Sequence, residues 1–151
     1  MQLKKTLLLA LFASFALTFA CPSTFAQEHK AINLAPERGL PFNDGIVVGN
    51  TIFVAGQEGT DQAGKLAAGG IAAETKATLE NIEKILKAGG FEMKDIVSVT
   101  VYLADIHDFP EMNKVYRSVI PDPKPARATI QAAALVNNAR VEISAIAVKQ
   151  K

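Results

Sequence analysis

An arginine that follows a proline-rich loop and a glutamate within an apolar segment are the residues of this sequence best suited to chemistry. Arg127 comes two residues after Pro125, and its guanidinium is a planar fork that binds a carboxylate through two hydrogen bonds. Glu142 is the only carboxylate in residues 141–147 (Val-Glu-Ile-Ser-Ala-Ile-Ala), where burial is costly unless another group pairs with it or uses it. The two residues predict a site that binds a small carboxylate and acts on it.

These residues belong to a longer pattern. Residues 53–57 read Phe-Val-Ala-Gly-Gln, residues 113–116 read Asn-Lys-Val-Tyr, and the Pro-x-Arg and Val-Glu-Ile-x-Ala-Ile-Ala segments follow. With these four segments in this order, the chain resembles the Rid family, the reactive intermediate deaminases of the YjgF type that are often labelled L-PSP endoribonucleases. The resemblance runs from about Pro41 to Val148.

The resemblance implies both a fold and a reaction. The fold is α+β, a chorismate-mutase-like two-layer sandwich with two helices packed on one face of a mixed six-stranded sheet, assembled as a homotrimer with active sites between subunits. The reaction is hydrolysis of reactive enamine or imine intermediates of amino acids to 2-oxo acids and ammonia. Because such imines already hydrolyse in water, orientation and one general base are enough, and we expect no metal and no organic cofactor.

The resemblance also assigns roles to individual residues. Arg127 would hold the substrate carboxylate, and Glu142 would position and deprotonate the attacking water. Asn113 is expected to line the pocket, Gly56 to let its backbone approach the ligand closely, and Thr129 to contribute its backbone amide. Without the resemblance, the residue types favour a surface arginine that caps a loop and an exposed helical asparagine, and the glutamate has the alternative of a buried structural carboxylate.

Three hydroxyl groups of the family pattern are missing here. Phe42 stands where the family has tyrosine, so that its ring alone is expected to line the substrate site, while Ala55 and Ala128 stand where it has serine. Each lost hydroxyl removes a hydrogen bond worth about 0.5–1.5 kcal/mol. This loss favours one alternative to the deaminase, a non-catalytic binder of small carboxylates or holdase-like protein. The endoribonuclease of the family label is a second alternative, which the balanced charge of the chain disfavours.

The amino-terminal residues have the pattern of a secretory signal peptide, expected to span residues 1–26. Lys4 and Lys5 form a basic start, residues 7–20 are apolar, and Thr24-Phe25-Ala26 ends in small residues at the positions that a signal peptidase reads. Cleavage before Gln27 would place the mature protein in the periplasm or outside the cell.

Cys21 raises the alternative of a lipoprotein, but the bulky Phe19 that precedes it fits lipid modification poorly. Cys21 is the only cysteine, so the mature chain, expected to be one domain of residues 27–151, has no thiol for a disulfide, for catalysis or for a metal. After cleavage the chain is expected to have no membrane attachment.

The charge of the mature chain is nearly balanced. The full chain has 16 basic and 15 acidic residues, and removal of Lys4 and Lys5 leaves 14 against 15, a net charge of −1. Because nucleic acids are bound largely through basic surfaces, we expect no nucleic-acid partner. The expected partners are a small 2-imino or 2-oxo acid and further copies of the chain.

Hydrophobic spacing predicts the order β-β-α-β-α-β-β and hence a single sheet with two helices on one face. The expected strands are 46–48, 51–54, 95–103, 128–135 and 140–148. The first expected helix follows Gly69-Gly70 and is closed by Gly89-Gly90, and the second begins near Asp108. Residues 108–111 read as a capping box, in which the carboxylates of Asp108 and Glu111 cap the second helix. His29 and His107 match no functional pattern and are expected on the surface.

The spacing of Arg127 and Glu142 sets a further constraint. If the last two strands paired around Asn137-Asn138, Glu142 would lie opposite Ala133, six residues from Arg127 or roughly 20 Å along the strand. Either these strands are not neighbours in the sheet, or the site joins residues of different chains.

Overall fold

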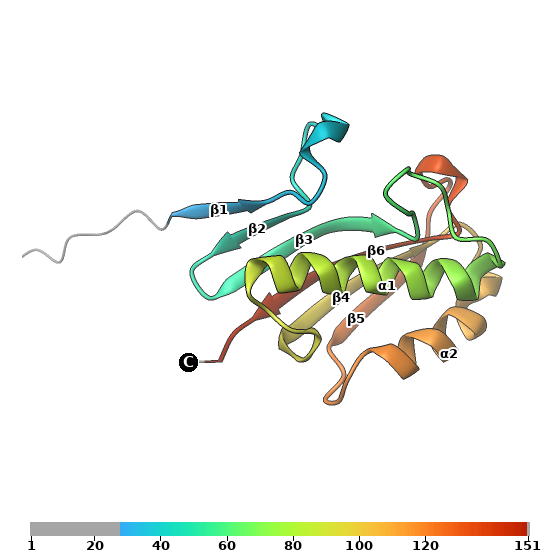
Figure 1. The fold of residues 1–151 in the computed structure, drawn as a ribbon. Coiled ribbons are helices and arrows are strands. Elements are labelled where there is room, and N and C mark those ends of the chain that lie inside the picture. Colours follow the sequence, from blue (N-terminus) through green and yellow to red (C-terminus); the bar gives the residue numbers. More distant parts are fainter. Residues whose placement is uncertain (1–27, 151) are drawn as a thin grey trace, which may run out of the picture.

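The computed structural model describes residues 28–150, so the expected signal peptide, Cys21 and the cleavage site before Gln27 lie outside the described residues. Within this range six strands form a single sheet, and two helices pack against one of its faces (Figure 1). The strands are β1 (His29–Ile32), β2 (Gly45–Val48), β3 (Thr51–Glu58), β4 (Ile96–Leu103), β5 (Ala126–Gln131) and β6 (Val141–Val148), and the helices are α1 (Gly70–Gly89) and α2 (Phe109–Val119).

The sheet has the order β1-β2-β3-β6-β4-β5. Its neighbouring strands are antiparallel except for β4 and β5, which are parallel. The sheet is therefore mixed and six-stranded with two helices on one face, and the predicted fold class is confirmed. None of the described helices is long and apolar enough to cross a membrane.

Buried and more exposed side chains alternate along β4 and β6, so that one face of the sheet forms the core and the other is open. Val99, Val101 and Leu103 of β4 are buried, as are Val141 and Ile143 of β6, and the residues between them are more exposed. The buried set packs against α1 and α2 and forms the core of the domain.

Helix α1 begins and ends at the predicted glycines. Leu79, Ile82 and Leu86 recur at helical spacing and are buried against the sheet. Gly90 ends the helix with a positive φ of 84°, and its N–H donates to the carbonyl oxygens of Leu86 and Lys87.

The capping box predicted at the start of α2 is wrong. The carboxylate of Asp108 makes no capping bond, because it instead accepts hydrogen bonds from Nε and Nη2 of Arg140 at 3.0 and 2.6 Å. Glu111 pairs with Lys114 one turn later. An ion pair between distant segments has replaced the local bond that the sequence pattern indicated.

Strand β5 occupies 126–131 instead of the predicted 128–135. It pairs in parallel with β4 from Ser98 opposite Ala126 to Leu103 opposite Gln131, and it ends where β4 ends. Because β4 lies between β5 and β6, the last two strands are not neighbours in the sheet. The first of the two alternatives drawn from the spacing of Arg127 and Glu142 is thus confirmed.

The face of the sheet opposite the helices is uncovered and partly apolar. Phe53 pairs with Ile146 on this face, and Ile130 lies on it beside Tyr102. The exposed fractions of Phe53 and Ile130 are 49% and 50%. A sheet that leaves such residues open offers an apolar surface for association.

Candidate functional site

Glu142 lies on the uncovered face of the sheet and not in the core. It sits between the buried residues Val141 and Ile143 and points away from them, because side chains of a strand alternate between faces. The sequence suggested a carboxylate enclosed by apolar residues, whereas in the structure Glu142 is half-buried at the edge of a cleft. The apolar neighbours in the sequence belong to the other face.

Gly56 makes room for the Glu142 carboxylate. Strand β3 has one more residue than β6 between the pairs Val54–Ala145 and Gln57–Ile143, which places a bulge at this point. A Cβ atom built on Gly56 would lie 2.0 Å from Oε1 of Glu142 and 2.7 Å from its Cδ. Only glycine allows the carboxylate to rest directly over the backbone here.

A cleft of about 590 Å³ surrounds this contact. Its walls include the apolar side chains of Leu40, Phe42 and Val136, and its polar residues include Glu58 as well as Glu142. The ring of Phe42 is 52% exposed and presents no hydroxyl. The structure thus brings three of the predicted residues together: Phe42, Gly56 and Glu142.

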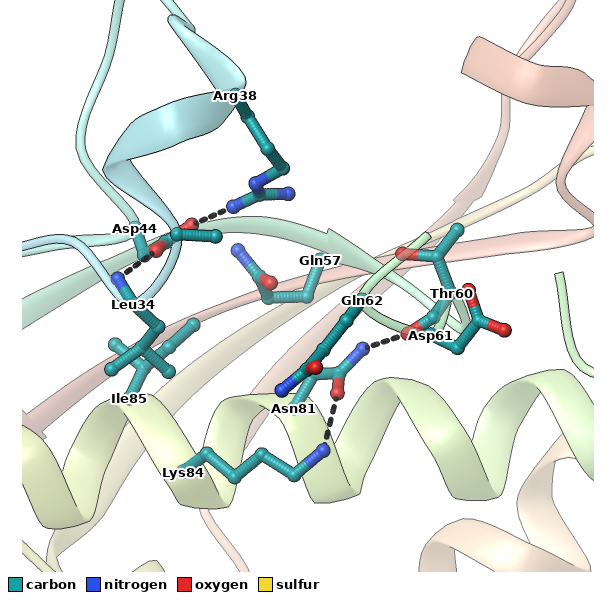
Figure 2. Close-up of a pocket in the computed structure, with 11 residues that line it drawn as sticks. Leu34, Arg38, Asp44, Gln57, Thr60, Asp61, Gln62, Asn81, Lys84 and Ile85 are labelled. Atoms are coloured by element: carbon teal, nitrogen blue, oxygen red, sulfur yellow. Dashed lines mark hydrogen bonds and ion pairs between the residues drawn. The ribbon is translucent and has the colours of Figure 1, made fainter. Parts of the chain in front are cut away.

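A smaller pocket lies on the helix side of β3, and hydrogen bonds around it anchor the segments that build the cleft (Figure 2). The buried carboxylate of Asp44 accepts hydrogen bonds from the N–H of Leu34 at 2.7 Å and from Nη2 of Arg38 at 2.9 Å. From α1, Nδ2 of Asn81 donates to the carbonyl oxygens of Glu58 and Thr60 at 3.1 and 2.8 Å. These bonds fix the loop before β2 and the end of β3.

Glu58 is a site residue that sequence reasoning missed. It pairs directly with Glu142 across β3 and β6, and its Oε2 accepts a hydrogen bond from Nδ2 of Asn137 at 2.9 Å. Its Oε1 is buried and has no hydrogen-bond partner in the described part of the chain. Burial raises the pKa of the Glu58 carboxyl above its ordinary value, the bond from Asn137 opposes this, and the charge of Glu142 adds to it.

Arg127 lies on the opposite face, beneath α2. Its Nη2 donates to Oδ1 of Asn113 at 2.7 Å, and its guanidinium lies 4.5 Å from the ring centroid of Tyr116 and 5.7 Å from that of Phe109. Thr129 follows on the same face, with a buried hydroxyl that has no partner among the described residues. The structure brings Arg127 and Asn113 together as predicted, with the side chain ordered by two aromatic rings.

Tyr116 completes this second group. Its side chain is buried, and burial raises the pKa of its hydroxyl above the ordinary value, while the positive charge of Arg127 opposes that rise. The hydroxyl has no hydrogen-bond partner in the described range. The uncharged ring of Tyr116 therefore stacks against the guanidinium of Arg127 and leaves the positive charge available for a carboxylate.

One chain does not bring Arg127 and Glu142 together. Arg127 pairs with Val99, whose side chain faces the helices, whereas Glu142 pairs with Tyr102, which faces away from them. Because paired residues of neighbouring strands face the same side of the sheet, the side chains of Arg127 and Glu142 lie on opposite faces. Each chain therefore carries two separate groups, one around Arg127 and one around Glu142.

The fold and these two groups define an α+β protein with a carboxylate-bearing cleft, and comparison with known proteins identifies its family. The family described as Endoribonuclease L-PSP matches residues 32–149, and the chain belongs to it. A 2-iminobutanoate/2-iminopropanoate deaminase of Bos taurus is 47% identical over 116 residues, which cover 76% of this chain and 85% of the relative.

Solved structures agree with this assignment. A putative endoribonuclease of Thermotoga maritima superposes with a TM-score of 0.72 at 41% identity, over 81% of this chain and 94% of that one. The YjgF gene product of E. coli gives a TM-score of 0.75 at 32% identity, over 80% and 99%. The predicted membership in the Rid, or YjgF-type, family is confirmed.

Proposed function

We propose that this protein is an enzyme that hydrolyses reactive enamine and imine intermediates of amino acids to 2-oxo acids and ammonia. The observation that carries the proposal is the carboxylate of Glu142 lying over Gly56 in a cleft with apolar walls. A carboxylate held there has room beside it for a water and a planar substrate. Relatives named as imine deaminases support the same reaction.

In this proposal the two groups have separate tasks. Arg127 binds the substrate carboxylate through its fork of N–H donors, and the Asn113 contact and the ring of Tyr116 hold that fork in place. Glu142 takes a proton from water as the oxygen bonds to the imine carbon. It gives this proton to the imine nitrogen, so that a carbinolamine forms. Glu142 then transfers the remaining hydroxyl proton to the nitrogen in the same way, the C–N bond breaks, and ammonia leaves as the carbonyl forms.

We propose further that the site is completed in a homotrimer. Support comes from the opposite-face positions of Arg127 and Glu142, because a heterologous contact between subunits can place the arginine group of one chain over the cleft of the next. The uncovered apolar face that carries Phe53 and Ile130 would be buried by the same association.

Export is part of the proposal as well. The basic start at Lys4-Lys5, the apolar residues 7–20 and the small-residue end at Ala26 support a cleaved signal and a periplasmic or secreted protein. The imine would then come from oxidation of amino acids outside the cytoplasm. Amino-terminal sequencing of protein made in its own host should begin at Gln27, and an intact Met1 would contradict export.

The test of the reaction is a coupled assay with an amino-acid oxidase that generates the imine in place. The wild-type protein should accelerate imine loss and ammonia release. Glu142→Gln keeps the size and hydrogen bonding of the side chain but removes the base, so hydrolysis should fall by about 10²-fold or more while 2-oxo acids still bind.

A second candidate is a non-catalytic binder of small carboxylates. Two residues that line the cleft favour it: the ring of Phe42 has no hydroxyl, and Ala55 stands where the family has a serine hydroxyl. If wild type and Glu142→Gln bind 2-oxo acids but both leave imine to decay at the rate of buffer, the binding protein takes the place of the enzyme.

A further inference from the structure

Glu58 gives the cleft a second carboxylate beside Glu142. The two residues are directly paired across β3 and β6 and point to the same, uncovered face. Directly paired residues on neighbouring antiparallel strands have Cα atoms about 4.5–5.5 Å apart. A substrate carbon held for attack at Glu142 therefore has Glu58 within reach of its side chain.

Within one chain, the described residues of the cleft offer no free cation to balance these two charges. Arg38 lines the cleft, but its guanidinium is paired with the buried carboxylate of Asp44 at 2.9 Å. Neither Glu58 nor Glu142 takes part in any ion pair in the described range, and Glu58 Oε1 is buried with no partner there. Like charges placed directly opposite destabilise a sheet unless something neutralises them.

A strained loop holds Glu58 in this position. Asn137 and Asn138 have positive φ values of 55° and 57°, a conformation that costs residues other than glycine free energy. In this conformation Asn137 donates from Nδ2 to Oε2 of Glu58 at 2.9 Å. The other carboxylate oxygen, Oε1, is left free for a further donor.

The remaining walls suit an aliphatic chain. Leu40, Phe42 and Val136 line the same cleft, and all three are substantially exposed in the single chain. An aliphatic stem packed along these side chains would bury apolar surface on both sides. A positive group at its end would meet the glutamates.

We propose that Glu58 determines substrate specificity by binding the positive end of the substrate side chain, so that the preferred substrates are 2-imino acids with cationic side chains, of the ornithine or arginine type. This inference rests on the proposed imine hydrolysis and names its substrate class. The α-carboxylate still binds Arg127 and the imine carbon still faces Glu142. The apolar walls take the stem, and Glu58 pairs with the cation.

The experiment compares kcat/KM for three imines generated by amino-acid oxidases from arginine, norleucine and glutamate. The side chain of arginine is cationic and the longest of the three, and those of norleucine and glutamate, neutral and anionic, match each other in length. Wild type should prefer the cationic imine over the neutral one and the neutral one over the anionic one. Glu58→Gln should lower the ratio of cationic to neutral kcat/KM by about tenfold or more, and Glu58→Lys should make the anionic imine the better charged substrate.

Glu83→Gln is the matched control, because Glu83 is an exposed carboxylate on α1 that pairs with Lys87 outside the cleft. Its ratio should equal that of wild type. A wild type that hydrolyses the neutral imine as well as the cationic one, or a ratio unchanged in Glu58→Gln, overturns this inference and leaves imine hydrolysis standing. If wild type hydrolyses none of the three imines, the proposed function itself fails. If the Glu58 variants do not fold, the order of the three imines with wild type decides alone.

Discussion

At the scale of single residues, the proposed chemistry depends on the close contact between Glu142 and Gly56. The carboxylate rests where a Cβ atom would otherwise lie, so its place is set by the absence of a side chain. Glycine was expected here to let the backbone approach the ligand, and the structure adds a second reason for it. It makes room for the Glu142 carboxylate.

Gly56→Ala should therefore lower activity without unfolding the protein. The new methyl group would displace the flexible end of Glu142, and a misplacement of about 1 Å at a reacting group costs roughly 10²-fold in rate. The measurement is kcat with the oxidase-coupled assay, with the thermal unfolding midpoint as the control for folding. Full activity in this variant would show that Glu142 does not act from the position seen here.

Glu58 should make stability depend on pH in a direction set by its burial. Because the pKa of Glu58 in the folded protein lies above its ordinary value of 4.5, the native state binds the proton more tightly than the unfolded state. That stabilisation is present at pH below 4.5 and is lost as pH rises through the folded pKa. Glutamine imitates the protonated form at every pH.

Glu58→Gln should consequently be more stable than wild type at pH 7 and about equal to it at pH 3.5. Urea unfolding at the two values measures the difference. Glu83→Gln, which removes an exposed carboxylate paired with Lys87, should show no gain at pH 7. A gain for Glu58→Gln that is as large at pH 3.5 as at pH 7 would contradict the raised pKa.

At the scale of elements, the sequence predicts those helices and strands whose apolar residues recur at regular local spacing. Helix α1 was found from its apolar positions and its terminal glycines, and β4 from its alternation. Strand β1 was missed, since four residues, His-Lys-Ala-Ile, show no alternation and pair only because β2 lies beside them. The end of β3 was missed because the bulge at Gly56 interrupts the pattern before Glu58.

The end of β3 is held by a helix, and this contact can be tested. Asn81→Ala removes the donor that binds the carbonyl oxygens of Glu58 and Thr60. Leaving part-buried carbonyls without a partner should cost about 1–3 kcal/mol of unfolding free energy. Asn33→Ala is the control, because its side chain bonds only an exposed N–H of Ala35 and should change stability by no more than about 0.5 kcal/mol. Equal effects of the two variants would contradict the anchoring role of Asn81.

At the scale of the whole molecule, the arrangement of the site follows from the order of the strands. The sequence indicated the candidate residues Arg127 and Glu142 but not that they lie on opposite faces. The face on which each side chain lies depends on the pairing between distant strands. The parallel pairing of β5 with β4 places Arg127 under α2, and the antiparallel pairing of β6 with β4 places Glu142 on the open face. Both groups are complete within a chain, and only association can join them.

Mixing two inactive variants tests this central claim most directly. Arg127→Ala and Glu142→Gln should each be inactive as pure proteins, because the first loses the carboxylate fork and the second the base. Unfolded together in equal amounts and refolded, they should recover about a quarter of the wild-type activity, since a site shared between adjacent subunits of a ring then combines an intact arginine with an intact glutamate in that fraction of cases. Activity that stays at the level of the separate variants, in mixed assemblies shown to have formed, would contradict a site built from two chains.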